Sequence, residues 1–449
     1  MTRNSAIKFF ALTALCAATQ ANAGAFQVNE HSAAGLGRAF AGEAAIADDA
    51  SVVARNPAGM TELQGPMFSA VGSYVQTDVE VDSRVSGHTT HNKDVAKSSF
   101  VPAMFYTTPI DDKLSVGFGV FSNYGFNTKY GKESTAAAGA THSDVKSVNF
   151  NTSLAYKLQD NLSVGFGVNA VYVQGELDSY LNNSAKNRAL AALQSDLSAI
   201  TELLNIDLAT LKKSASKIDP AALGSGTIIN VKGDDWGFGW NAGVLWEPLK
   251  GTRIGASYRS EVKTSLEGKA KSDVFNGQGI VPQFNSKGSV DFDMPAIAEL
   301  SVYQDVTDQL AVHASYMRTY WSSFKEITVK LKSGVPVPSE QKDFRDSSRW
   351  AIGTTYKLDD QWTLRAGYAY DNSPVRNSKR DFRIPDVDRQ WYTAGASYKI
   401  DNAQKVDFGY ALLRSKEADV SHITPLATIE GKIKAAKVNI FSVQYNYVF

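Results

Sequence analysis

The chain of 449 residues is poor in cysteine and lacks long hydrophobic runs, and each absence argues against a class of protein. Its only cysteine is Cys16, so the chain beyond that position has neither disulfide staples nor thiolate metal sites. After the N-terminal segment, no stretch of about 18 apolar residues exists, which argues against membrane-spanning helices. The 46 basic and 46 acidic residues cancel, so the overall charge offers no attraction for nucleic acid.

The N-terminal segment has the pattern of an export signal. Residues 1–23 combine a basic start, an apolar run and the small-residue sequence Ala-Asn-Ala at 21–23, which predicts a secretory signal peptide cleaved after residue 23. A lipoprotein signal ending at Cys16 is the alternative, but Leu15 is bulky where lipoprotein processing needs a small residue. The segment therefore predicts a protein that leaves the cytoplasm.

Residues 441–449 have the pattern of a β-strand with one apolar face. The apolar positions are Phe441, Val443, Tyr445, Tyr447 and Phe449. Most of the positions between them are polar, as expected for a strand that separates two environments. In a soluble sandwich, the apolar face would pack against a second sheet. In a membrane barrel, the apolar face would contact lipid, and the polar face would line a water-filled lumen.

The same alternation recurs along the chain between short polar turns and long polar segments. Six short turns are recognisable, at 111–113, 159–161, 248–252, 305–309, 359–361 and 401–405. Seven long polar segments lie near 82–98, 123–144, 179–233, 266–288, 326–345, 371–388 and 415–433. Six short turns join twelve strands, and one further strand at each end gives fourteen. The even number predicts a closed barrel with both termini on the side of the short turns.

Residues 24–65 do not alternate and are rich in glycine and alanine. Small residues suit a backbone that packs closely inside a lumen, so this segment predicts a plug, here called the hatch. A free periplasmic arm is the alternative. The fold class predicted is all-β: a fourteen-stranded antiparallel transmembrane β-barrel over 66–449, plugged by the N-terminal hatch. Any single segment could be a sandwich strand, but the regular sequence of short and long connections favours the barrel.

Several longer stretches are similar to one known family. Besides the hatch from Gly24 to Ala58, they are WGFGWNAGVLW at 236–246, YRSEVK at 258–263, SNYG at 122–125, DNSPV at 371–375 and IPDVDRQW at 384–391. With these stretches the chain resembles the long-chain fatty-acid transporter (FadL) family of Gram-negative outer membranes, over essentially its whole length after residue 23. The resemblance implies an outer-membrane transporter that needs no cofactor and has no enzymatic activity.

The resemblance also implies a hatch that moves and a wall that opens. The hatch motif Asn56-Pro57-Ala58 should contact the wall and rearrange when a ligand arrives; from the residues alone, it predicts a tight turn. The third barrel strand should carry a kink that leaves a lateral opening from the lumen into the bilayer. An ordinary strand end entering a loop is the alternative. The residues that match this opening are Ser122, Asn123, Tyr124 and Gly125.

Three further positions bear on the hatch and on the cargo. Asp371 matches a family position that bonds to the hatch; otherwise it is an aspartate at the start of a loop. A fatty-acid carboxylate needs a cation, but the position of an expected arginine holds Ser179. The second basic position aligns near Glu340 or Lys342, which makes Lys342 the candidate for the head group. A solvated loop lysine is the alternative.

The long segment 179–233 predicts an amphipathic helix in an outer loop. Its apolar residues recur at intervals of three and four, which places them on one helical face. This stripe either packs on a neighbouring loop or captures apolar ligand from outside. Its residues are Leu190, Leu193, Leu197, Ile200 and Leu204.

The function predicted is passive uptake of long-chain fatty acids or similar hydrophobic molecules. The steps are capture by the outer loops, binding in the lumen, rearrangement of the hatch and lateral exit. Small aromatic hydrocarbons as cargo, and a general diffusion porin, are the alternatives. An outer-membrane enzyme is disfavoured because the six histidines are scattered, and no catalytic or metal-binding residues are predicted. The expected partners are the ligand, outer-membrane lipid and lipopolysaccharide, with the protein a monomer.

Overall fold

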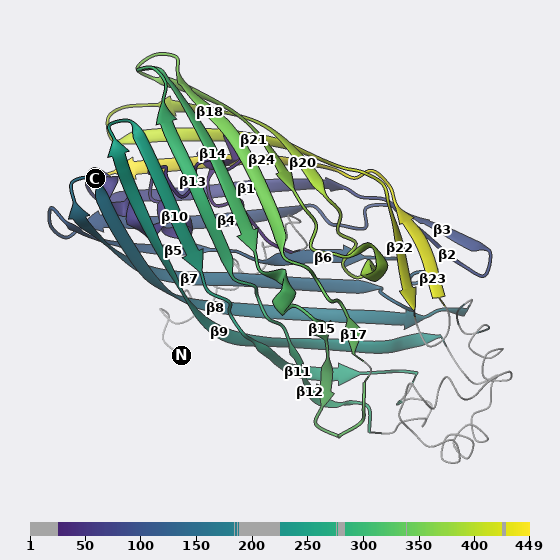
Figure 1. Ribbon diagram of the computed structural model, residues 1–449. Coiled ribbons are helices and arrows are strands. Elements are labelled where there is room, and N and C mark those ends of the chain that lie inside the picture. The colour runs from purple at the N-terminus through teal and green to yellow at the C-terminus, as the bar shows by residue number, and fades with distance from the viewer. Residues whose placement is uncertain are drawn as a thin grey trace.

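The computed structural model describes residues 26–183, 185, 187, 225–274, 276, 283–337, 339–423 and 428–449. The predicted signal peptide lies outside these residues, so its cleavage site stays a prediction. Within the described ranges, no helix combines the length and the apolar character that crossing a membrane requires. The chain is built mainly from long β-strands (Figure 1).

Among the described residues, eighteen strands form one sheet that closes on itself. They are β1 (Met67–Asp78), β4 (Ser99–Pro109), β5 (Leu114–Phe121), β6 (Gly125–Lys129), β7 (His142–Gln159), β8 (Leu162–Leu181), β9 (Gly226–Leu249), β10 (Thr252–Arg259), β11 (Ser265–Lys271), β12 (Ser286–Asp291), β13 (Ile297–Asp305), β14 (Leu310–Thr319), β16 (Val329–Leu331), β18 (Ser347–Lys357), β19 (Trp362–Asp371), β20 (Arg389–Lys399), β21 (Gln404–Ser415) and β24 (Lys437–Val448). Four of them continue another strand: β6 follows β5, β11 follows β10, β12 precedes β13, and β16 follows β14. Fourteen barrel strands result, and β1 pairs antiparallel with β24, so the predicted barrel is confirmed.

The two ends of the barrel differ in the length of their connections. All six predicted short turns join neighbouring barrel strands at one end, where the C-terminus also lies (Figure 1). The opposite end carries a small second sheet at the right of Figure 1. It consists of β22 (Ala418–Ile423), β23 (Thr428–Ile433), β2 (Val81–Val85) and β3 (His88–Asn92). Other elements of the long connections are β15 (Glu326–Ile327), β17 (Glu340–Gln341) and the 3-10 helices η3 (Trp321–Ser323) and η4 (Asn377–Lys379).

Side chains along the barrel strands alternate between the outer surface and the lumen. On β9, Trp236, Phe238 and Trp240 are exposed on the outer face, whereas Gly237 and Asn241 are buried toward the lumen. Large apolar side chains in such numbers on an outer surface are typical of contact with lipid. The small and polar residues of β9 therefore face the lumen, and its large apolar residues face outward.

The described part of the hatch, residues 26–65, lies inside the barrel. Its backbone amides donate hydrogen bonds to polar side chains of the wall: Gly42 N to Ser315 Oγ at 2.7 Å, and Ala33 N to Gln444 Oε1 at 2.9 Å. Wall side chains thereby satisfy backbone groups that an irregular segment leaves unpaired. The helices of the hatch are α2 (Ala33–Gly37), α3 (Val52–Arg55) and the 3-10 helix η1 (Pro57–Glu62).

Glycines in the wall allow the hatch to touch the barrel backbone. A Cβ built on Gly243 would overlap Asn56 Oδ1, and a Cβ built on Gly165 would overlap the backbone nitrogen of Ala58. No side chain therefore fits at these two wall positions while the hatch is in place. The small inward residues of β8 and β9 are a requirement of hatch packing.

The variant Gly243→Ala is expected to loosen the hatch, because the added methyl group collides with Asn56. Overpacking of this kind costs roughly 1–3 kcal/mol. Limited proteolysis of the detergent-solubilised protein should cut residues 26–65 faster, with the barrel itself still folded. Gly131→Ala is the control, since a Cβ there meets nothing within 4 Å. Equal protection of the hatch in both variants would contradict the packing argument.

Candidate functional site

The motif Asn56-Pro57-Ala58 forms a capped turn against the wall. Asn56 Oδ1 accepts a hydrogen bond from Ala58 N at 3.1 Å, and Pro57 begins the helix η1. The Nδ2 of Asn56 donates to Ala44 O in the hatch at 2.6 Å and to Val244 O in β9 at 2.9 Å. One side chain thus joins its own turn, another part of the hatch and the barrel. The rearrangement that the resemblance implies stays a prediction.

The hydrogen-bonded ladder between the second and third barrel strands is interrupted. Pairing of β4 with β5 ends at Met104 and Val120. The two strands meet again at an isolated bridge between Ala96 and Thr128. Ala96 lies eight residues before Met104, and Thr128 lies eight residues after Val120, so both contacts belong to the same antiparallel register. Strand three therefore leaves the wall and returns to it without a shift in its pairing with the second barrel strand.

The stretch without mutual pairing, called the window below, comprises residues 97–103 and 121–127. On its other side, β6 still pairs with β7, and β4 still pairs with β1. On the side of β7, the gap is shorter: pairing ends at Phe121 with Asn149 and resumes at Gly125 with Lys146, shifted by one residue. The four residues predicted for the lateral opening, 122–125, all lie in the window.

The hatch supplies hydrogen bonds to strand three within the window. Val28 N donates to Asn123 O at 2.7 Å, and Gly125 N donates to Phe26 O at 2.8 Å. These bonds give the displaced strand a backbone partner inside the lumen. The hatch is therefore a short substitute strand for the missing part of the ladder.

Side chains also hold the displaced strand in the lumen. Tyr124 Oη donates to Pro295 O at 2.6 Å, and Ser147 Oγ donates to Tyr124 O at 2.6 Å. His31 Nε2 of the hatch lies 2.6 Å from Ser122 O. The kink is thus fixed by contacts with the hatch, with β7 and with the segment before β13.

Phe26 of the hatch lies at the centre of a group of buried rings. Its ring centroid is 4.4 Å from that of Trp321, 5.0 Å from Phe292, 5.3 Å from Phe324 and 6.0 Å from Tyr124. This aromatic cluster consists of Phe26, Tyr124, Phe126, Phe292, Trp321, Phe324 and Phe344. Because one ring fills its centre, an apolar ligand fits there only when Phe26 moves.

A charge cluster of Glu340, Lys342, Asp381 and Arg383 lies among the long connections. Lys342 is fully buried, and its Nζ lies 3.1 Å from Glu340 Oε2 and pairs with Asp381. Burial opposes the charge of Lys342, but Asp381 and Glu340 outweigh it, so the pKa of its ammonium lies above the usual value. Burial also opposes ionisation of Glu340, yet Arg383 and Lys342 together lower its pKa well below the usual range. The predicted head-group candidate is therefore already paired with carboxylates, and its role stays a prediction.

Asp371 lies at the end of β19 beside an arginine of the next strand. Its Oδ2 is 3.6 Å from Arg389 Nη2, and the Nη1 of Arg389 is 3.0 Å from Asp386 Oδ1. Nearby, Arg349 Nη2 donates to Ala39 O of the hatch at 2.9 Å. The bond between wall and hatch found in this region thus comes from Arg349, and a direct contact of Asp371 with the hatch stays a prediction.

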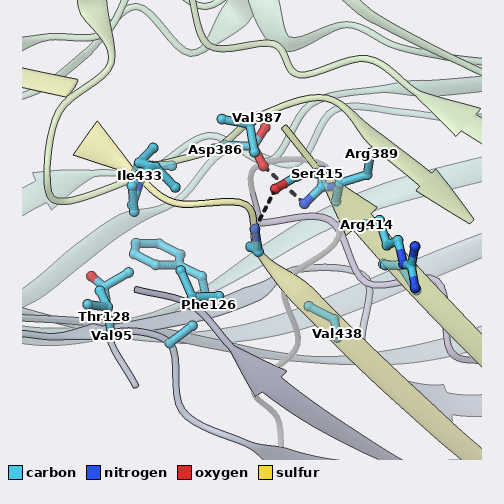
Figure 2. A pocket seen from close by; sticks show the side chains of 16 residues that line it. Val95, Phe126, Thr128, Asp386, Val387, Arg389, Arg414, Ser415, Ile433 and Val438 are labelled. Atoms are coloured by element: carbon cyan, nitrogen blue, oxygen red, sulfur yellow. Dashed lines mark hydrogen bonds and ion pairs between the residues drawn. The ribbon is translucent and has the colours of Figure 1, made fainter. Parts of the chain in front are cut away.

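A mostly apolar cavity of about 70 Å³ lies beside the window (Figure 2). In Figure 2, Phe126 and Val95 face it from one side and Asp386, Val387 and Arg389 from the other. This volume is small compared with the roughly 300–1,000 Å³ of typical ligand pockets. A long acyl chain would fit only if the surrounding segments moved.

Two predicted features cannot be placed with the others. The leucine stripe at 190–204 lies outside the described residues. Ser179 is buried in β8, where it presents no cation. Conversely, Phe26 and Arg383 were not predicted from the sequence. Phe26 is one of two phenylalanines in a segment of small residues, and Arg383 is one arginine among many polar loop residues, so neither gave a specific signal.

A closed barrel with an apolar outer surface and a lumen filled by its own N-terminal segment defines a plugged transmembrane β-barrel protein. Residues 14–449 match the family described as outer membrane protein transport protein (OMPP1/FadL/TodX). The chain belongs to this family. It is thus an outer-membrane transporter of hydrophobic compounds from a Gram-negative bacterium.

Similar proteins cover nearly the whole chain. It is 35% identical over 443 residues to the long-chain fatty acid transport protein of Escherichia coli O6:H1, with 96% of each chain covered. It is 34% identical over 470 residues to outer membrane protein P1 of Haemophilus influenzae, with 97% of each covered. A crystal structure of a Pseudomonas aeruginosa FadL homologue superposes with a TM-score of 0.79 at 24% identity, covering 95% of this chain and 100% of that one. The crystal structure of the toluene transporter TodX of Pseudomonas putida superposes with a TM-score of 0.69 at 21% identity, covering 96% of this chain and 100% of that one. The two structural matches support the fold.

The variant Val28→Pro is expected to free strand three in the window, because proline lacks the N–H that Val28 donates to Asn123 O. An unsatisfied buried group costs about 1–3 kcal/mol. A cost of 1.4 kcal/mol changes an equilibrium constant about tenfold. The local opening of residues 121–127, and with it the rate of their amide exchange, should therefore rise about tenfold or more. Hydrogen–deuterium exchange with mass spectrometry measures this. Val28→Ala keeps the donor and serves as control; identical exchange in both variants would refute the role of this bond.

Proposed function

We propose that this transporter carries long-chain fatty acids, or hydrophobic molecules of similar shape, by passive uptake with lateral exit. The observation that carries the proposal is the window, an interrupted stretch of wall beside the aromatic cluster. The relatives named for long-chain fatty acid transport are similar over 96% of this chain, which supports the same class of cargo. Capture by the leucine stripe at 190–204 enters the proposal on the sequence pattern alone.

The solvation of an acyl chain favours an exit through the side of the barrel. A tail of about sixteen carbons gains on the order of 12 kcal/mol on leaving water, at ~0.8 kcal/mol per methylene. Release into the periplasm would transfer the tail back into water and would be unfavourable by the same amount. A route from the aromatic cluster through the window into the bilayer keeps the tail in apolar surroundings. The hatch, which fills the lumen toward the short-turn end, supports this route.

Phe26 couples the binding of a ligand to the window. A chain that enters the aromatic cluster has to displace the Phe26 ring from its centre. The carbonyl of the same residue accepts the bond from Gly125 N, so displacement also removes part of the substitute strand. Filling the cluster and releasing strand three are therefore one event in this proposal. The turn at Asn56, bonded to β9, is the second place where the hatch would have to adjust.

Small aromatic hydrocarbons are the second candidate cargo, favoured by the aromatic character of the cluster around Phe26. The two candidates differ in charge and length. An acyl carboxylate needs a cation at one end of the site, whereas a hydrocarbon such as toluene needs none.

The purified protein is expected to bind oleate more tightly than toluene, because a long chain buries more apolar surface. Quenching of the buried Trp321 in the aromatic cluster reports occupancy, and Trp321→Phe identifies its share of the signal. If the protein binds toluene and does not bind oleate, the fatty-acid proposal is wrong and small aromatic hydrocarbons are the cargo. A large ion conductance in planar bilayers, with no ligand present, would instead indicate a diffusion porin.

Bridging the window is expected to block uptake. Pro102 and Ser122 face each other across it by register, and beyond Cys16 the chain has no other cysteine, so a cysteine pair at these positions can be joined by a short cleavable cross-linker. Oleate uptake into cells without another fatty-acid transporter should fall to background and return on cleavage. A pair at Tyr106 and Phe118, partners in the intact ladder, is the control. Undiminished uptake with the window bridged would exclude the lateral route.

A further inference from the structure

The charge cluster adjoins the apolar interior that reaches the window. Phe344, two residues after Lys342, and Ile384, next to Arg383, belong to the same buried hydrophobic group as Phe26. Two cations are thus continuous with apolar surroundings that extend to the hatch. This arrangement is complementary to a molecule with an anionic head and an apolar tail.

Glu340 occupies the two cations with a carboxylate of the chain itself. Its Oε1 accepts from Arg383 Nη2 at 2.9 Å, and its Oε2 accepts from Arg383 Nε at 3.0 Å. This two-point geometry is typical of arginine bound to a carboxylate. Oε2 also accepts from Lys342 Nζ at 3.1 Å. The carboxylate of a fatty acid can form the same three bonds.

The other carboxylate of the charge cluster is fixed in place. Asp381 Oδ1 accepts from the backbone nitrogens of Arg383 at 2.9 Å and of Ile384 at 3.1 Å, so it shapes its own loop. The carboxylate of Glu340 bonds, within the described part of the chain, only to Arg383 and Lys342. The side chain of Glu340 is also 29% exposed, against 10% for Asp381. Glu340 is therefore the carboxylate that can leave.

The cations are held independently of Glu340. Arg383 Nη1 donates to Ser143 Oγ at 3.1 Å, and its Nη2 donates to Gly139 O at 2.9 Å. Lys342 keeps its pairing with Asp381. Departure of Glu340 would leave Lys342 paired with Asp381, and Arg383 without a hydrogen-bonded carboxylate among the described residues, with Asp178 as the other nearby acid. The two positioned cations are then a site for one further anion.

We propose that Glu340 is a placeholder for the carboxylate of the cargo, displaced when an anionic amphiphile binds. This inference rests on the proposed function and deepens it, because it adds Arg383 to the head-group candidate Lys342 and assigns control of access to Glu340. The exchange replaces each broken ion pair by an equivalent one. A neutral hydrophobic molecule cannot replace Glu340, so the site selects for charge as well as for apolar length.

Glu340→Gln removes the competing charge and is expected to tighten oleate binding about tenfold, with the binding of oleyl alcohol unchanged. Glu326→Gln is the matched control. Glu326 lies on β15, which pairs with β17, and its exposed carboxylate contacts Gln341 and Thr328. This control should change neither affinity. Tryptophan quenching or calorimetry with the two ligands measures both effects.

The outcomes separate this inference from the proposal beneath it. If wild type binds oleate and Glu340→Gln leaves its affinity unchanged, or tightens both ligands equally, the placeholder role is wrong. If wild type binds neither ligand, the proposed function fails first.

A second measurement covers the case in which Glu340→Gln does not fold. An environment-sensitive fluorophore on Ser339→Cys, an exposed position beside Glu340, should respond to oleate and not to oleyl alcohol. The same response to both ligands would overturn the inference.

Discussion

Backbone hydrogen bonding in a wall that faces lipid is the constraint on which the rest of this structure depends. A membrane barrel can open sideways only where the freed donors and acceptors find other partners. Here the hatch provides them, through the bonds of Val28 and Phe26 to strand three. The position of the N-terminal segment inside the lumen meets this requirement, because it places Phe26 and Val28 next to the displaced strand.

The barrel could be predicted from the sequence because its information is local. Alternation at every second residue reveals which face of a strand meets lipid, as for Trp236, Phe238 and Trp240 on β9. Turns of a few polar residues separate neighbouring strands, so counting them gives the number of strands. Each inference needs only residues that lie next to one another in the chain.

The site could not be predicted in the same way, because its contacts join distant parts of the chain. Nothing near Lys342 indicates that Asp381 neutralises it, or that Arg383 shares Glu340 with it; the sequence alone left a solvated lysine as the alternative. Phe26 meets Trp321 and Phe324 only because the hatch folds back into the lumen. Family resemblance marked residues 122–125, but the hydrogen bonds that make an interruption tolerable there became visible only in three dimensions.

The unchanged register on both sides of the window limits how far the wall can part. Strand three is held at Val120 and at Thr128 and spans the gap with as many residues as the opposite stretch, 96–104. An extended chain reaches at most ~3.6 Å per residue against ~3.3 Å in a strand, so the slack allows an inward bow on the order of 6 Å. That is little more than the ~4.8 Å spacing of neighbouring strands. Under the proposed lateral route, such a slot would pass a thin flexible chain lengthwise and would be too narrow for a branched or folded molecule, so the length of the backbone would limit the thickness of the cargo.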